Sequence, residues 1–298
     1  MVGRRILASQ TGRGQVLAMK RPIAMFDSGE GGLTVLKQAR ALFPGEDYLY
    51  VCDSAHFPYG DRSLSEVRDF FLAILEFMLT QDPQAVVIAC NTATAAALAE
   101  ARRMAPVPVI GVVQAGVEAA ARATQNRRVG VLETLATHRS QIYAKSLTAC
   151  DPSIVVLERP CPLLVVLAEN GWTDGPECVD AVQQCAGGLI DEGVDTLILG
   201  CTHFPHMQKV FNQVVAGRAH VIDPGLETAR SLPDYLPDLS PQGDQGNLAF
   251  FTTGDPEDSA RVARLLWPEV EVKPSRLVWQ GEKVLMANPS PNASTRAP

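Results

Sequence analysis

Residues 85–95 read AVVIACNTATA, and this stretch decides the expected fold. An apolar run of strand length stops at Cys90, and an alanine-rich segment with a helical pattern follows over residues 92–105. A strand that leads directly into a helix is typical of parallel sheets covered by helices. We therefore predict that Cys90 lies at the carboxyl end of a strand, the edge where open parallel sheets bind ligands.

The stretch LGCTHFP at 199–205 repeats this arrangement around Cys201. Further strands are expected at 23–26, 48–52, 107–112, 128–132 and 154–157, with helical patterns between several of them. The segment IAMFDS at 23–28 aligns with VGVLET at 129–134, and each half continues to a strand that ends in a cysteine. This pattern indicates an internal duplication, which would bring the two cysteines to one cleft.

The expected fold is α/β, with two pseudo-symmetric parallel-sheet domains of three layers and the active site in the cleft between them. We expect residues 20–112 and 225–279 to form the first domain and residues 113–224 to form the second. Residues 1–19 are expected to be a disordered extension and residues 280–298 a disordered tail. Because Met19 shortly precedes the first strand, both Met1 and Met19 are candidate start residues.

The composition argues against several classes of function. The chain has 298 residues, of which 46% are hydrophobic and 20% charged, and its formal net charge is −7. This balance is typical of a globular protein, and we expect no nucleic acid and no membrane as a main partner. The seven cysteines are odd in number and lack zinc-finger spacing, which favours a reducing cytoplasm over a disulfide framework.

Two cysteines have neighbours that suggest chemistry. A helix that begins after Cys90 would favour its thiolate, and Asn91 and Thr92 can cap that helix or hold a ligand carboxylate. Near Cys201, the side chain of His203 can lower the thiol pKa, shuttle protons or bind an anion. The alternative interpretation is structural, with buried cysteines, helix caps and a packed histidine.

Three further motifs add polar residues. FDSGEGGLT at 26–34 ends a strand with Asp27 and Ser28, and its glycines fit neither a dinucleotide fingerprint nor a P-loop. PYGDRS at 58–63 offers Tyr59 and Gly60, and LAENG at 167–171 ends an apolar run with Glu169.

Two opposed thiols suit the racemisation of an amino acid. The reaction removes the α-proton from one face and returns a proton to the other, so one group begins as thiolate and the other as thiol. Asp27 could tune one thiol, and Glu169 or His203 the other. Helix N-termini and the polar side chains near the cysteines could hold the substrate carboxylate.

Taken together and in order, the five motifs resemble the glutamate racemase family over residues 21–224, with a weaker match to residue 279. The resemblance implies racemisation of L-glutamate to D-glutamate for peptidoglycan, with no cofactor and no metal. It implies that Cys90 acts on D-glutamate and Cys201 on L-glutamate, supported by Asp27, Glu169 and His203. The substrate contacts it implies are Asp27, Ser28, Tyr59, Gly60, Asn91, Thr92, Thr134, Thr137, Thr202 and His203. It also implies a homodimer and a cell-wall precursor as activator.

Glu30, Cys52 and Glu133 depart from the family pattern, which has a small or apolar residue at the first position and glycine at the other two. We expect these changes to affect substrate affinity more than reaction type. Glu133 is the most important of the three, because it adds a carboxylate close to the site. This carboxylate would either repel a dicarboxylate substrate or point into solvent. Three alternatives remain open at this point: a racemase of aspartate or another acidic amino acid, an amino-acid-binding protein without catalysis, and a thiol redox protein.

Overall fold

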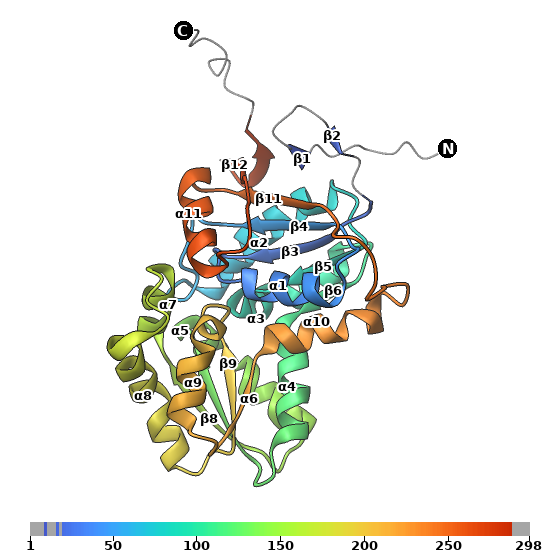
Figure 1. Ribbon diagram of the computed structural model, residues 1–298. Coiled ribbons are helices and arrows are strands. Elements are labelled where there is room, and N and C mark those ends of the chain that lie inside the picture. The colour runs from blue at the N-terminus through green and yellow to red at the C-terminus, as the bar shows by residue number, and fades with distance from the viewer. Residues whose placement is uncertain (1–8, 11–15, 18–19, 288–298) are drawn as a thin grey trace.

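Two β-sheets organise the chain. The computed structural model describes residues 9–10, 16–17 and 20–287 (Figure 1). The larger sheet has the order β13-β12-β11-β4-β3-β5-β6, and the smaller sheet has the order β10-β9-β7-β8. The strands of the larger sheet are β3 (Ile23–Asp27), β4 (Tyr48–Cys52), β5 (Ala85–Ile88), β6 (Val109–Gly111), β11 (Leu248–Thr252), β12 (Ser275–Gln280) and β13 (Lys283–Met286). Those of the smaller sheet are β7 (Arg128–Glu133), β8 (Val155–Pro160), β9 (Thr196–Gly200) and β10 (His220–Ile222).

The two sheets share one topology. The order β4-β3-β5-β6 in the larger sheet corresponds to β8-β7-β9-β10 in the smaller one, and all of these pairs are parallel. In each sheet the first strand of the unit lies between the second and the third, so the connections run in opposite directions from it. Such a reversal opens a crevice at the carboxyl ends of the strands. Cys90 follows β5 and Cys201 follows β9, so each cysteine lies at this edge of its own sheet.

Helices cover both faces of the larger sheet. On one face, α2 (Leu64–Leu79) and α3 (Asn91–Met104) pack against side chains such as Phe26, and Phe71 of α2 is fully buried there. On the other face, α1 (Leu33–Leu42), α10 (Pro224–Tyr235) and α11 (Pro256–Leu266) contribute to a second cluster that includes Met25 and Leu36. Each fully buried large apolar side chain contributes about 1.5–3 kcal/mol to folding.

The smaller sheet is covered in the same way. The helices α4 (Val112–Ala123) and α6 (Ile142–Cys150) cover one face. The helices α7 (Pro162–Glu169), α8 (Gly175–Asp191) and α9 (Gln208–Val215) cover the other. The short helices α5 (Leu135–Ser140) and η1 (Phe204–Met207) follow the carboxyl ends of β7 and β9. The predicted α/β fold with two three-layer parallel sheets is therefore confirmed.

The inner strands have no polar face. All residues of β3, β4, β5 and β9 are buried. A strand covered by helices on both sides reads as a continuous apolar run instead of an alternating one. This explains why these strands could be recognised from sequence by their length and by the helical patterns around them.

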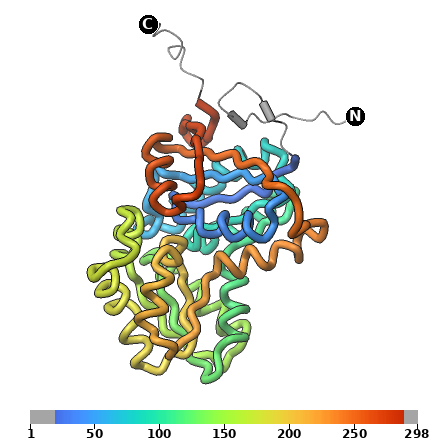
Figure 2. Tube along the Cα trace, in the orientation of Figure 1, coloured from blue at the N-terminus to red at the C-terminus, as the bar shows by residue number. Residues whose placement is uncertain are grey.

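The chain enters the smaller sheet after β6 and returns to the larger one through α10 (Figure 2). The larger sheet is thus built from two separate segments, with β11, β12 and β13 added by the later one. The limits proposed for the two domains, at residues 112 and 225, stay a prediction. None of the helices in the described part of the chain combines the length and apolarity needed to cross a membrane.

The segment 280–298, expected to be disordered, includes an ordered strand. β13 pairs antiparallel with β12, and Val284 is 4% exposed where it packs beside Leu277. A buried valine and a full strand pairing hold residues 283–286 in place, so the prediction of disorder from residue 280 is wrong for them. Residues 288–298 lie outside the described residues. So does most of the 1–19 extension, of which β1 (Ser9–Gln10) and β2 (Val16–Leu17) are described as an antiparallel pair.

His206 of η1 is partly buried and lies near Leu266 of α11, which belongs to the other half of the molecule. Among the described residues its Nε2 has no hydrogen-bond partner. Burial, assisted by the nearby charge of His203, lowers the pKa of His206 to about 3. The native state therefore holds a neutral imidazole at pH values where an unfolded histidine, with a pKa of about 6.5, binds a proton.

We expect this histidine to make the fold sensitive to mild acid. Since the unfolded state takes up a proton below pH 6.5 and the native state does not, the native state loses stability as the pH falls. Between pH 7.5 and 5.5 His206 should contribute a loss of about 1 kcal/mol in the free energy of unfolding. Urea unfolding at both pH values would measure it, and His206→Gln should lose that part of the pH dependence. His220→Gln, at an exposed position, is the matched control, and equal pH dependence in all three proteins would contradict the assignment.

Candidate active site

A cavity of about 350 Å³ lies where the carboxyl ends of the two sheets meet. Residues expected from the sequence line it from both halves: Ser28, Tyr59, Gly60, Cys90, Asn91, Thr92, Thr134, Glu169, Cys201, Thr202 and His203. Asp27 and Thr137 are fully buried and lie behind this lining. Sequence reasoning did not identify the remaining wall, which consists of Phe57, Pro58, Asp61, Leu135, Pro162, Val165, Val166 and Asn170. Pro58, Asp61 and Asn170 belong to the PYGDRS and LAENG motifs, whereas the other five residues are apolar and carry no motif of their own.

Cys90 is the N-cap residue of α3, directly after β5. Its Sγ accepts a hydrogen bond from Ala93 N–H at 3.4 Å and lies 3.8 Å from the Ser28 hydroxyl. The helix N-terminus alone predicts a thiolate here. Burial and then the charge of Asp27 act against it, and together they raise the pKa of Cys90 far above that of an ordinary thiol. Cys90 is therefore a neutral thiol, contrary to the expectation from the helix.

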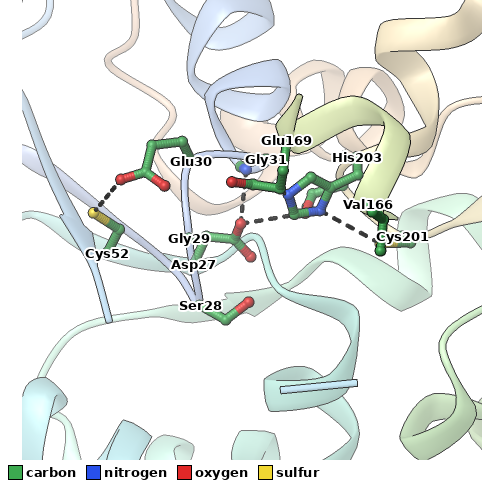
Figure 3. A network of polar contacts seen from close by, with 12 residues as sticks. Asp27, Ser28, Gly29, Glu30, Gly31, Cys52, Val166, Glu169, Cys201 and His203 are labelled. Carbon is green, nitrogen blue, oxygen red and sulfur yellow. Dashed lines mark hydrogen bonds and ion pairs between the residues drawn. The ribbon is translucent and has the colours of Figure 1, made fainter. Parts of the chain in front are cut away.

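Cys201 has a different polar neighbour. His203 Nδ1 lies 3.7 Å from the Cys201 Sγ, and His203 Nε2 lies 2.5 Å from Glu169 Oε1 (Figure 3). Burial opposes a charge on His203, but the hydrogen bonds and charges of Cys201 and Glu169 outweigh it and raise the pKa of His203 well above its ordinary value. An imidazolium in this position can donate one N–H to the carboxylate and the other to a Cys201 thiolate.

Asp27 connects the two halves beneath the cavity. Its Oδ2 accepts hydrogen bonds from Gly32 N–H at 2.7 Å and from the Thr202 hydroxyl at 3.2 Å. Its Oδ1 has no partner in the described part of the chain. Burial raises the pKa of Asp27, although the charge of His203 acts in the opposite direction. Asp27 is thus placed to influence Cys90 and Thr202 without lining the cavity itself.

Three threonine hydroxyls from the two halves form a closed triangle of hydrogen bonds beside the cavity. Thr92 of α3 lies 3.0 Å from Thr134 and 2.9 Å from Thr137, and the last two are 3.0 Å apart, all measured between Oγ1 atoms. Thr134 is also the N-cap of α5 and accepts the Thr137 backbone N–H. Thr137 therefore supports the two hydroxyls that line the cavity and does not line it.

A buried aspartate holds the loop that carries Tyr59 and Gly60. The Tyr59 hydroxyl donates to Asp53 Oδ2 at 2.7 Å, while the Thr253 hydroxyl and Trp279 Nε1 donate to Asp53 Oδ1 at 2.6 and 3.2 Å. No local sequence pattern indicates this cluster, because Thr253 and Trp279 come from the later segment of the chain. In the same way Tyr143, whose hydroxyl donates to Asn91 Oδ1 at 2.7 Å, carries no motif.

The three departures from the family pattern all lie outside the cavity lining. Glu30 Oε1 accepts from Cys52 Sγ at 3.5 Å and from the Ser54 hydroxyl at 3.1 Å. Glu133 is fully buried, so the expectation that its carboxylate points into solvent is wrong. Burial raises the pKa of Glu133 to about 9, which leaves the side chain neutral near pH 7. A neutral side chain outside the lining does not repel an anionic substrate.

Comparison with known proteins finds consistent similarity. The sequence model of a family described as Asp/Glu/Hydantoin racemase matches residues 34–232. A glutamate racemase of Symbiobacterium thermophilum is 46% identical over 256 residues, which cover 84% of this chain and 91% of that protein. The crystal structure of a glutamate racemase isoform from Bacillus anthracis superposes with a TM-score of 0.80 at 34% identity and covers 86% of this chain and 96% of that one. The Escherichia coli glutamate racemase, solved with L-glutamate and the activator UDP-MurNAc-ala, has a TM-score of 0.69 at 28% identity and covers 83% of this chain and 96% of that one.

We expect the site to depend on the absence of a side chain at residue 31. A Cβ atom there would lie 2.5 Å from His203 Cε1 and 2.8 Å from the Thr202 hydroxyl, and both side chains are buried. Overpacking of this kind lowers stability by about 1–3 kcal/mol. Gly31→Ala should therefore lower the free energy of unfolding by that amount in urea titration.

The matched control is Gly188→Ala in α8, where an added Cβ meets only the Arg159 guanidinium at 3.0 Å. That side chain can move, and alanine favours a helix over glycine by about 1 kcal/mol. The control should be as stable as the parent protein or more so. A Gly31→Ala protein as stable as this control would refute the packing argument.

Proposed function

The chain belongs to the Asp/Glu/Hydantoin racemase family, and on this premise we propose that it racemises L-glutamate to D-glutamate without a cofactor. In the proposed reaction two thiols, Cys90 and Cys201, move the α-proton. One observation carries the proposal: the two cysteines come from the two halves of the molecule, line the same cavity and have opposite electrostatic surroundings.

The difference between the cysteines supplies the two protonation states that the reaction needs. Cys201, paired with the His203 imidazolium, takes the α-proton of L-glutamate as a thiolate. Cys90, the neutral thiol, gives its proton to the opposite face of the α-carbon, and D-glutamate results. Cys201 is then a thiol and Cys90 a thiolate, which is the state from which the reverse reaction starts. The Ala93 N–H, 3.4 Å from Cys90 Sγ, stabilises the new charge.

Neutral donors would hold the two carboxylates of the substrate. Among the residues that line the cavity there is no lysine and no arginine, and His203 is the cation. The backbone N–H groups of Asn91 and Thr92, the first two residues of α3, have no partner within the helix and can bind an anion at its N-terminus. Hydroxyls of Ser28, Thr92, Thr134 and Thr202 add further donors. Such donors also stabilise the charge that develops beside the α-carbon during proton removal.

The alternatives have less support. The relatives compared above are glutamate racemases, which favours glutamate over aspartate. A binding protein without catalysis would not need two thiols in opposite protonation states. A thiol redox protein would need Cys90 and Cys201 to form a disulfide, whereas the proposed substrate occupies the space between them.

We also propose the cellular setting. D-glutamate from this reaction would supply peptidoglycan synthesis, and the seven free cysteines suit a reducing cytoplasm. A cell-wall precursor is proposed as an activator, by analogy with the activator bound to the Escherichia coli relative. A homodimer stays a prediction.

The proposal is tested by incubation with L-glutamate in deuterated water. We expect the optical rotation to decay to zero while deuterium enters the α-carbon of the product. Because each thiol is required for one of the two proton transfers, Cys90→Ala and Cys201→Ala should each lower kcat by roughly 10²–10⁴-fold or more.

Cys150→Ala is the matched control, since Cys150 is exposed and does not line the cavity, and it should keep full activity. Circular dichroism of each variant would establish that the fold persists. Full activity in either active-site variant would refute the two-thiol mechanism. Faster turnover of L-aspartate than of L-glutamate would refute the substrate, and binding of glutamate without any change in rotation would favour the binding protein.

A further inference from the structure

Three potential metal ligands gather outside the cavity, at the carboxyl edge of the smaller sheet. Glu133 ends β7, His138 belongs to α5, and Glu158 lies on β8, the parallel neighbour of β7. One ligand atom from each side chain lies within 4.8 Å of the other two. None of these residues lines the cavity, and the proposed racemisation uses none of them.

One carboxylate oxygen of Glu133 is buried without a hydrogen-bond partner in the described part of the chain. Its side chain has no exposed surface, and Oε1 lies 3.0 Å from His138 Nδ1. Oε2, the second oxygen, has no hydrogen-bond partner among the described residues. A buried polar atom left unpaired costs about 1–3 kcal/mol, so a proton or a cation is needed to satisfy this carboxylate.

The donor set fits a divalent transition-metal ion. Two carboxylates and one imidazole are ligands for Zn²⁺ and Mn²⁺, and three protein ligands leave a position open for water. Two ligand atoms of a tetrahedral zinc ion lie roughly 3.3 Å apart, because each is about 2.0–2.1 Å from the metal. The Glu133 to His138 separation of 3.0 Å is already close to this value. Glu158 would need to approach by a small side-chain rotation.

The surroundings permit a cation to enter. The His138 side chain is 39% exposed and gives a route from solvent. Glu158 Oε1 accepts the Ala144 N–H at 3.2 Å, which leaves its other oxygen available. The nearby Lys145 ammonium donates to the Ser140 carbonyl at 2.9 Å and so is engaged beside the cluster.

We propose that Glu133, His138 and Glu158 bind one divalent transition-metal ion, Zn²⁺ or Mn²⁺, at a site separate from the cavity. The ion would fix the turn from β7 into α5, which carries Thr134 and Thr137. The same turn is held by a hydrogen bond from Cys161 N–H to the Glu133 carbonyl at 2.8 Å. Because the three ligands come together only in the native state, metal binding would stabilise that state against unfolding by mass action.

Electron paramagnetic resonance with Mn²⁺ tests the site directly. Mn²⁺ is the chosen probe because thiolates prefer softer metals, so the cysteines of the chain compete little for it. The full-length protein, stripped with a chelator, should remove the free Mn²⁺ signal with a stoichiometry of one ion per chain. Zn²⁺ should displace the bound Mn²⁺, since it binds such ligands more tightly.

Two variants address the ligands, and one serves as control. Glu133→Gln keeps the volume of the buried side chain, and His138→Ala changes a partly exposed one. Each should weaken Mn²⁺ binding by at least about 10-fold. His220→Ala removes an exposed histidine elsewhere and should leave binding unchanged. The thermal midpoint of the parent protein should rise with Mn²⁺, and that of Glu133→Gln should not.

Unchanged Mn²⁺ affinity in either ligand variant would overturn the proposal. So would the absence of binding at millimolar Mn²⁺, in which case a proton on Glu133 satisfies the carboxylate. These readouts do not involve racemisation, so the metal site and the proposed function can fail independently.

Discussion

Buried hydrogen bonds beside the cavity connect the two halves of this molecule and fix their relative position. Asp27 from the larger sheet accepts from Thr202, which follows the smaller sheet, and Thr92 of α3 meets Thr134 and Thr137 of the α5 turn. Each group is removed from water, so its loss would leave a partner unsatisfied at a cost of about 1–3 kcal/mol. Because Cys90 and Cys201 belong to different sheets, the placement of one cysteine relative to the other depends on these contacts between the halves.

The two halves share one strand topology, and their side chains make the two cysteine positions chemically unequal. Both cysteines lie after a buried parallel strand at the same place in the topology. Cys90 is surrounded by burial and the carboxyl group of Asp27, which favour the thiol. Cys201 instead lies 3.7 Å from Nδ1 of the His203 imidazolium, which Glu169 holds in place. In the proposed reaction, this symmetric scaffold with asymmetric electrostatics would provide a proton acceptor and a proton donor at the same time.

Sequence patterns predicted the inner strands, the repeat and most of the cavity lining, because these features are local. A buried parallel strand followed by a polar turn and a helix can be recognised within a dozen or so residues. Asp53 and Tyr143 could not be found in this way, since their partners are distant in sequence and carry no motif. Strand β13 was missed because a polar composition outweighed one buried valine, Val284. The sequence shows that Glu133 departs from the family pattern, but it does not show whether the side chain is buried or exposed. That depends on the packing of β7 against β8 and α5.

The path of the chain through the larger sheet bears on how the protein is made. Tyr59 is oriented through Asp53, and Asp53 receives hydrogen bonds from Thr253 and Trp279. Trp279 leaves the ribosome long after the strands that precede Cys90 and Cys201. The nascent chain can therefore fold both cysteine-bearing edges early and still lack a fixed Tyr59 loop. The wall of the cavity that carries Tyr59 is therefore complete only when β11 and β12 have joined the sheet.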